Sequence, residues 1–349
     1  MDEINTNSEL NFVEVKKPSH ILTRFVLFGG LFLILLGTVM VYGYAFTRDN
    51  FFSFQTNQSI QAAGRVYLTL TPLSGQYAGR TDIYFFDIVA NKLTRFADPD
   101  GSSMTLTPRG AGDRSMVFSI LKHAPAEPFD LETLITKYNS DSKELTYFFD
   151  VAAAGHDKQL PSWSNEMNGA LYMTPLGDSK LPEDATVYFT NAQGSRKVTN
   201  GLYPQFLPDG LHFIVLKNDG LYLMKVDSDF SRKILSSFSK VTHPNQTFDI
   251  AADGSLLAWT QPEKKKIYIV SLQNLFGGDE LKVTSTVKLK CFLPVFSPQG
   301  NQLTVVEVSA SEPSKQSLVV VDLVSKSKKV ILDLKNYDIG RLFVTDWMD

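Results

Sequence analysis

The side chains that could carry chemistry are few and scattered. The chain holds five histidines, and those within its folded part fall in predicted loops or, for one of them, at a strand start. No Gly-x-Ser-x-Gly, His-Glu-x-x-His or Gly-x-x-x-x-Gly-Lys-Ser/Thr motif occurs. A nucleophile and its base could meet only by folding from distant segments. We therefore expect no catalytic residue, no metal and no cofactor, and structural or solvated roles for His123, His156, His212 and His243.

Aspartates recur near the ends of predicted strands, at Asp87, Asp150, Asp227 and Asp322. A ring of such carboxylates could hold a cation. However, an aspartate at a strand-to-turn junction readily accepts hydrogen bonds from nearby backbone amides. The spacing therefore favours turn caps over a metal site.

Two groups of lysines could contact anionic lipid or acidic glycan. Both fall at predicted hairpin tips, and no aromatic platforms alternate with them as single-stranded nucleic acid would require. The net charge of −3 and the pI near 6.0 give no cationic field for nucleic acid. We therefore expect solvated turns and no nucleic-acid partner for the groups Lys264-Lys265-Lys266 and Lys326, Lys328, Lys329.

The composition predicts a sizeable folded core. The 349 residues are 43% hydrophobic and 12% aromatic, which suits one large domain or two small ones. The one cysteine, Cys291, rules out an internal disulfide and a clustered-thiol zinc site. We expect it to be buried beside Phe292.

Residues 25–46, "FVLFGGLFLILLGTVMVYGYAF", are predicted to form a transmembrane helix. They contain no charge, and as a helix they would span roughly 33 Å at about 1.5 Å per residue. A cleaved signal peptide is the alternative, supported by Gly43-Tyr44-Ala45, but the apolar stretch is long and 24 residues precede it. We therefore favour an uncleaved anchor.

The charges that flank this segment predict its orientation. Lys16, Lys17 and Arg24 precede it, and only Arg48 lies close behind. Residues 1–24 should therefore form a short cytoplasmic tail, residues 47–63 a linker, and residues 64–349 an extracytoplasmic domain. In the tail, "NFVEV" at 11–15 could pair with a sheet edge of a partner, but five alternating residues are a short pattern, and we favour a featureless tail.

A repeat dominates the rest of the chain. "PQFLPDG" at 204–210, "FDIAADG" at 248–254 and "PVFSPQG" at 294–300 are each followed by two apolar strands. Weaker copies begin near "SMTLTPRG" and "PSWSNEMNG". A period in the forties with about four strands per unit is typical of a propeller blade. The equivalent positions, with steps of 57, 43, 44 and 46 residues, are taken as Leu106, Trp163, Phe206, Ile250 and Phe296.

The two ends of the repeat region predict how the ring closes. Segments 65–72, 82–88 and 92–96 give three strands of a first blade, and segment 341–347 gives a lone strand. If the last strand completes the first blade, six blades close and no edge stays exposed. Trp347 then occupies the position of Trp163. Seven blades would require strands within 121–143, but "DLETLITKY" has a helical spacing, and we expect a surface excursion there.

The repeats "PQFLPDGLHFIVLKNDGLYLMKVD" and "PVFSPQGNQLTVVEV" resemble the TolB-type propeller repeat, Pro-x-Phe/Trp-Ser-Pro-Asp-Gly followed by a strand. The resemblance covers about residues 64–349 and implies an all-β, six-bladed propeller in a bacterial cell envelope. Leu207 and Ala251 replace the serine, Ala252 the proline and Gln299 the aspartate, so the resemblance supports the turn and not a shared ligand. Prolyl-oligopeptidase-like enzymes carry similar blades, but no hydrolase domain fits here.

These features predict a membrane-anchored, extracytoplasmic binding or scaffolding module. We expect a protein partner at the blade-tip loops, with the insertion at 121–143 as a candidate contact. The alternative is an enzyme, such as a lyase or a glycan-cleaving hydrolase, with its site in the central funnel; a buried acidic pair would favour it. A sensor that signals inward would have only the short tail with which to do so.

Overall fold

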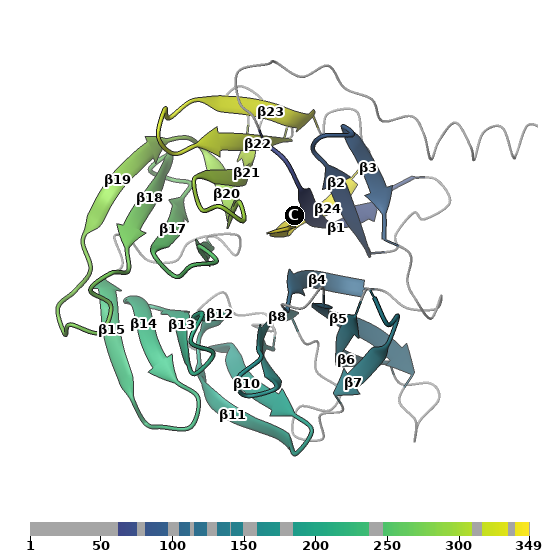
Figure 1. Cartoon of the computed structure of the whole chain (residues 1–349), viewed down its shortest axis with the longest axis vertical. Coiled ribbons are helices and arrows are strands. Elements are labelled where there is room, and N and C mark those ends of the chain that lie inside the picture. Colours follow the sequence, from purple (N-terminus) through teal and green to yellow (C-terminus); the bar gives the residue numbers. More distant parts are fainter. Residues whose placement is uncertain are drawn as a thin grey trace, which may run out of the picture. The chain divides into compact units, whose positions relative to one another are not determined.

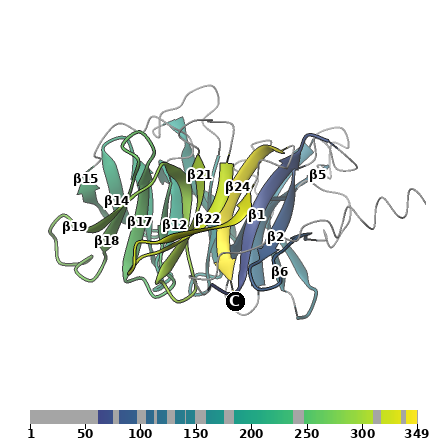
Figure 2. The same ribbon diagram turned by 90° about the horizontal axis from the view of Figure 1, so that it is seen from above.

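A computed structural model describes residues 62–348 with gaps at 75–80, 97–104, 112–114, 124–130, 140, 149–158, 175–183, 237–246, 309–315 and 334–338. The strands in these residues form six antiparallel sheets of four strands each. Figure 1 shows the sheets arranged radially around a common centre, and Figure 2 shows the same ring from its side. The domain is a six-bladed β-propeller, as the repeat predicted.

Each blade is named here by its strands from the centre outward. Blade 1 is β24 (Ile339–Met348), β1 (Arg65–Pro72), β2 (Asp82–Asp87) and β3 (Lys92–Arg95). Blade 2 is β4 (Thr105–Gly110), β5 (Ser115–His123), β6 (Leu131–Asn139) and β7 (Leu145–Phe148). Blade 3 is β8 (Gln159–Ser164), β9 (Gly169–Met173), β10 (Thr186–Asn191) and β11 (Gly194–Asn200).

The other three blades follow in chain order. Blade 4 is β12 (Leu202–Phe206), β13 (His212–Lys217), β14 (Gly220–Lys225) and β15 (Ser231–Ser236). Blade 5 is β16 (Phe248–Ile250), β17 (Leu256–Gln261), β18 (Lys266–Ser271) and β19 (Val283–Lys288). Blade 6 is β20 (Cys291–Phe296), β21 (Gln302–Val308), β22 (Gln316–Asp322) and β23 (Lys328–Asp333).

The C-terminal strand closes the ring, as predicted. β24 pairs with β1 from Arg65 opposite Met348 to Pro72 opposite Ile339, and it lies at the centre of the ring in Figure 1. β24 also contacts the innermost strands of both neighbouring blades, β20 and β4. The indole Nε1 of Trp347 donates a hydrogen bond of 2.8 Å to the carbonyl oxygen of Ala63. The start and the end of the domain are thereby joined in one sheet.

The core lies between neighbouring sheets rather than within one centre. Hydrophobic clusters join blade 1 to blade 2, blade 2 to blade 3, and so on around the ring to the contact of blade 6 with blade 1. Between blades 3 and 4, for example, the ring of Phe189 meets that of Phe206 edge-on at 6.5 Å. Because each blade depends on both neighbours for burial, closing the ring is what completes the core.

The turn between the first two strands follows the predicted chemistry. Gly210, Gly254 and Gly300 have φ of 67°, 71° and 73°, in the left-handed region that favours glycine. The carboxylate of Asp209 accepts the backbone N–H groups of Leu211 and His212 at 2.9 Å. In blade 5 the carboxylate of Asp253 likewise accepts the N–H of Ser255 at 2.9 Å, whereas the third clear repeat has Gln299 at this place.

The structure corrects two predictions about blade 2. The segment "DLETLITKY" is not a helical surface excursion, because Leu131–Asn139 is strand β6 and pairs with β5 along its whole length. The helical spacing misled because β6 is buried from Thr133 to Thr136, on both faces, so its apolar residues do not alternate. The strand belongs to blade 2, and the ring keeps six blades. Leu106 is also not the equivalent of Trp163; Gly110 is, as shown below.

The predicted tail, transmembrane segment and most of the linker, residues 1–61, lie outside the described residues. Within the described part, no helix is long and apolar enough to cross a membrane. Strand β1 begins at Arg65, where the sequence predicted folding to start.

Candidate functional site: the central funnel

The innermost strands share a register irregularity that sets the lining of the centre. In β4, β8, β12, β20 and β24, the pairing with the second strand shifts just before the strand ends. Leu160, Tyr203 and Leu293 take φ of 52° to 55° at this bulge, a region uncommon for non-glycine residues. Bulges re-aim the side chains that follow them. The first paired residues after the shift are Arg109, Ser162, Gln205, Val295 and Asp346. In blade 5, where no shift occurs, Asp249 holds the matching place. We call these six residues the ring positions.

Four of these side chains, those of Ser162, Gln205, Asp249 and Asp346, bond to the next blade. The hydroxyl oxygen of Ser162 accepts the N–H of Phe206 at 3.0 Å, and Asp249 Oδ2 accepts the N–H of Phe296 at 2.8 Å. Asp346 Oδ2 accepts the N–H of Gly110 in the same way across the closure of the ring. An innermost strand has no further strand to pair with, and these contacts satisfy its free amides.

Three charged groups of this ring interact with one another. Burial raises the pKa of Asp249 to about 6, against the lowering effects of the Arg109 charge and the hydrogen bonds from Phe296 and Gln205. Burial also raises the pKa of Asp346, again opposed by Arg109. The Asp346 charge further raises that of Asp249. Arg109 thus compensates two carboxylates that a low-dielectric site would otherwise favour in the neutral form.

Two polar atoms of the ring remain without a bond. Arg109 Nε and Gln205 Oε1 are buried and have no hydrogen-bond partner among the described residues. Gln205 Nε2 donates to Asp249 Oδ1 at 2.8 Å, so its carbonyl oxygen stays available. One donor and one acceptor of the ring are therefore enclosed by the protein and make no hydrogen bond among the described residues.

The centre holds a cavity of about 1150 Å³ that residues of all six blades line. Its open side carries the turns after the innermost strands, and we call this side the funnel face. Around the funnel, the residue after each ring position is large and buried in five blades. These residues are Trp163, Phe206, Ile250, Phe296 and Trp347. In blade 2 the same position is Gly110.

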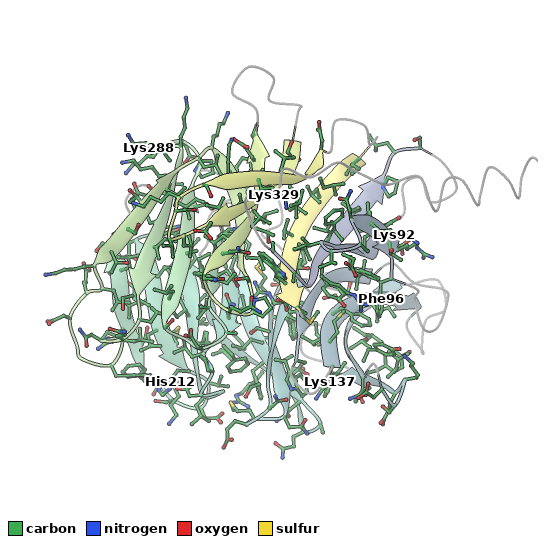
Figure 3. The ribbon with its side chains drawn as sticks, turned by 45° about the horizontal axis from the view of Figure 1, so that its top comes forward. Lys92, Phe96, Lys137, His212, Lys288 and Lys329 are labelled. Carbon is green, nitrogen blue, oxygen red and sulfur yellow. The ribbon has the colours of Figure 1, made fainter. Side chains whose placement is uncertain are left out.

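The aspartates and histidines singled out in the sequence do not gather. Asp87 accepts the N–H of Ala90, and Asp322 those of Val324 and Ser325, so both cap turns as predicted. Asp227 pairs with Arg196 at the surface, and Asp150 lies outside the described residues. His212 begins β13 as predicted and contacts Asp209 at 2.7 Å; it is labelled in Figure 3.

The remaining candidates fall as follows. His123 ends β5, so its loop assignment was wrong, while His156 and His243 lie outside the described residues. The lysine groups stand at the β17–β18 and β22–β23 hairpins, as predicted. Cys291 is buried, and burial raises the pKa of its thiol. Among the residues that the structure describes, no three His, Cys, Asp or Glu side chains gather to hold a metal ion.

The charged residues of the funnel were not predicted from the sequence. Arg109, Asp249 and Asp346 each precede the equivalent position in their repeat, so the correct alignment would have gathered them into one ring. The degenerate blade 2 repeat, aligned on Leu106, concealed Arg109.

The fold and funnel define a six-bladed propeller of TolB-like architecture. The crystal structure of TolB from Acinetobacter baumannii is similar over 81% of this chain and 67% of that chain, with a TM-score of 0.56 and 13% identity. The structure of putative TolB from Agrobacterium tumefaciens is similar over 83% of this chain and 100% of that chain, with a TM-score of 0.49 and 12% identity. At these identities the likeness concerns the fold alone. No protein-family model and no curated protein matches the sequence.

Proposed function

We propose that the chain is a membrane-anchored, extracytoplasmic propeller of the cell envelope that binds a protein partner with its funnel face. The anchor is the apolar segment at 25–46, and the charges before it favour a cytoplasmic N-terminus. The TolB-like architecture supports the class, since a rigid ring presents fixed side chains at its blade tips.

The observation that carries the proposal is the placement of exposed apolar side chains. Four of the large ones lie on hairpins between the two outer strands of blades 1, 4, 5 and 6. In blade 1, Trp347 lies at the funnel end of β24, and Asp87 is the last residue before the hairpin of β2 and β3. The pairing of β24 with β1 and of β1 with β2 puts these two residues at the same end of the blade. In the other blades too, the third strand ends on the side where the innermost strand ends. All four hairpins therefore project from the funnel face. The four residues, with their exposed fractions, are Val89 (75%), Phe230 (39%), Phe276 (62%) and Val324 (86%).

We call these four exposed residues the apolar arc. Part of the apolar arc is held in place before binding. The imidazole of His212 lies edge-on to the rings of Phe276 and Phe230, with centroids 5.1 Å and 6.1 Å apart, and Asp209 fixes the imidazole. Rigid aromatic side chains lose little conformational entropy on binding and often dominate the energy of an interface. An apolar arc around a polar funnel is the arrangement expected of a docking face.

Photo-crosslinking in intact membranes tests this proposal. A benzoylphenylalanine placed at Phe276 or Val324 should yield a discrete crosslinked protein. The matched control is Leu73, which is 57% exposed but lies on the β1–β2 connection at the opposite end of blade 1. Crosslinks from Leu73 that equal those from Phe276 and Val324, or no crosslink from either funnel-face position, would overturn the proposal.

The anchor and its orientation need a separate test. Reporter fusions after residue 349 should be active only outside the cytoplasm, and replacing residues 25–46 with a cleavable signal peptide should release the propeller from the membrane. A propeller that remains membrane-bound after this exchange would show that the segment is not the anchor.

An enzyme with its site in the funnel is the second candidate. The buried pair Asp249 and Asp346 favours it, because raised carboxyl pKa values suit acid–base chemistry. Both carboxylates, however, also hold backbone amides of a neighbouring blade. Assays on a panel of acidic and neutral glycans would decide: activity in the wild type that Asp249→Asn abolishes supports this candidate, and inactivity of the wild type removes it.

A further inference from the structure

The funnel is electrically asymmetric. The cations that line it, Arg65, Arg109 and Lys143, all belong to blades 1 and 2 or to the turns beside them. Three of its four carboxylates, Glu166, Asp209 and Asp249, come from blades 3, 4 and 5. The fourth carboxylate belongs to blade 1, but its two oxygens accept the backbone amides of residues 110 and 347. Arg109 is compensated by Asp249 and Asp346, so the cations on the side of blades 1 and 2 that favour an anion are Arg65 and Lys143.

On that side the cavity continues between the two blades. Its lining includes Tyr67, Phe85 and Phe96 from blade 1 and Met116 and Tyr138 from blade 2. The rings of Tyr67 and Phe85 lie 5.9 Å apart, and those of Phe96 and Tyr138 meet edge-on at 5.8 Å. Figure 3 labels Phe96, just after β3. We call this part of the cavity the aromatic cleft.

Gly110 lies where the cleft meets the funnel. The other five blades carry a large buried residue at this position. A Cβ on Gly110 would lie only 3.1 Å from the sulfur of Met348 and 3.2 Å from Asp346 Oδ2. In blade 2 the end of β24 therefore occupies the space beside this position, and the cleft lies beyond it.

Two cations stand at the aromatic cleft. The Arg65 guanidinium lies 5.1 Å from the centre of the Phe85 ring, and its Nε is 3.7 Å from Asp87. Lys143 is exposed and has no ion pair among the described residues. A ligand with an apolar ring and one negative charge could place the ring against Phe85, Phe96 and Tyr138 and its charge beside Lys143.

We propose that the aromatic cleft between blades 1 and 2 binds a small amphipathic anion, such as an aromatic carboxylate. This site is independent of the docking face proposed above, which lies on the outer hairpins of blades 1, 4, 5 and 6. Binding requires no movement of the blades, because the cleft is already open to the funnel.

Isothermal titration of the full-length chain with two matched probes tests the proposal. The probes are 2-naphthaleneacetate, an aromatic anion, and 2-naphthaleneacetamide, which keeps the shape and lacks the charge. The wild type should bind one equivalent of the acetate, more tightly than the acetamide. Undetectable binding of the acetate, or equal affinity for both probes, would overturn the proposal.

Charge reversal then locates the anion. Lys143→Glu should weaken binding of the acetate roughly three- to tenfold and leave the acetamide unchanged, the range expected for a partly solvated ion pair. The matched control is Lys326→Glu, since Lys326 is also exposed and has a φ of 56° against 59° for Lys143, but lies away from the cavity. Equal effects of the two reversals would show that the anion is not held at the cleft.

A third variant tests the aromatic walls. Phe96→Ala should weaken both probes alike, because it removes ring contact without altering charge. Phe96 is half-buried after the end of β3, so the blade can tolerate the change, and circular dichroism would verify the fold. Unchanged binding of both probes to this folded variant would place them outside the cleft.

Discussion

The buried carboxylate of Asp249 makes stability depend on pH in an unusual direction. Its pKa is raised from 3.8 to about 6 in the folded protein. Between these values the folded state binds a proton more readily than the unfolded state, so the free energy of unfolding falls as the pH rises and levels off above pH 6. The variant Asp249→Asn removes this titration, together with the charge that Arg109 compensates.

The structure indicates how the variant keeps its bonds. Asparagine can still accept the N–H of Phe296 with its carbonyl oxygen. Its new amide group would face Gln205, whose Oε1 is buried and has no partner among the described residues. If Gln205 rotates its side-chain amide, that oxygen accepts the new N–H. We therefore expect the variant to fold normally.

The magnitude follows from the shift in pKa. A difference of about two units corresponds to roughly 3 kcal/mol in full, of which about 2 kcal/mol develops between pH 4 and pH 7. Over this range the unfolding free energy of the variant should rise by about 2 kcal/mol relative to wild type. Urea denaturation at several pH values, followed by the fluorescence of Trp163, Trp259 and Trp347, measures the difference.

A second carboxylate provides a control of opposite sign. The pKa of Asp322 is lowered, chiefly by the hydrogen bond from the Ser325 backbone, so this aspartate contributes stability that is lost as the pH falls. Asp322→Asn should therefore lose stability relative to wild type as the pH rises. If the Asp249→Asn difference did not depend on pH, or followed the sign of Asp322→Asn, burial would not be the dominant effect at Asp249.

Three further variants test the ring. Gly210→Ala should destabilise the domain more than Gly300→Ala, although both glycines have a left-handed φ, because of the two only Gly210 would bring its Cβ within 2.8 Å of another blade. Gly300→Ala should cost about 1 kcal/mol. Thermal unfolding compares the two variants. Trp347→Ala should cost about 3–5 kcal/mol, measured by urea denaturation, and a loss below 1 kcal/mol would contradict the closure by β24. Ser162→Ala should cost about 1–3 kcal/mol, since it leaves the buried amide of Phe206 unpaired; an unchanged urea midpoint would show that this bond between blades contributes nothing.

The blades could be predicted because their signals are local. A turn such as Pro208-Asp209-Gly210 requires glycine for its positive φ, and glycine recurs at this place in all three clear repeats. Asp209 caps the turn, and only one of the three repeats has a residue other than aspartate there, Gln299. The segments at 65–72, 82–88 and 92–96 became strands β1, β2 and β3 with bounds that differ by at most one residue. Strand β6 was missed because burial on both faces removes the alternation that marks a strand.

The sequence by itself determined the number of blades, the turn chemistry and the strand that closes the ring, since each depends on contacts between residues near in the chain or on a count of strands. Only the tertiary structure decided which side chains meet in the funnel. Arg109, Asp249 and Asp346 come from three blades and line one cavity. Bulges in β4 and β24 aim Arg109 and Asp346, while β16, which carries Asp249, has no register shift. The raised pKa values of Asp249 and Asp346 arise from burial by distant segments. The cleft between blades 1 and 2 arises from the packing of two blades. No local pattern encodes either of them.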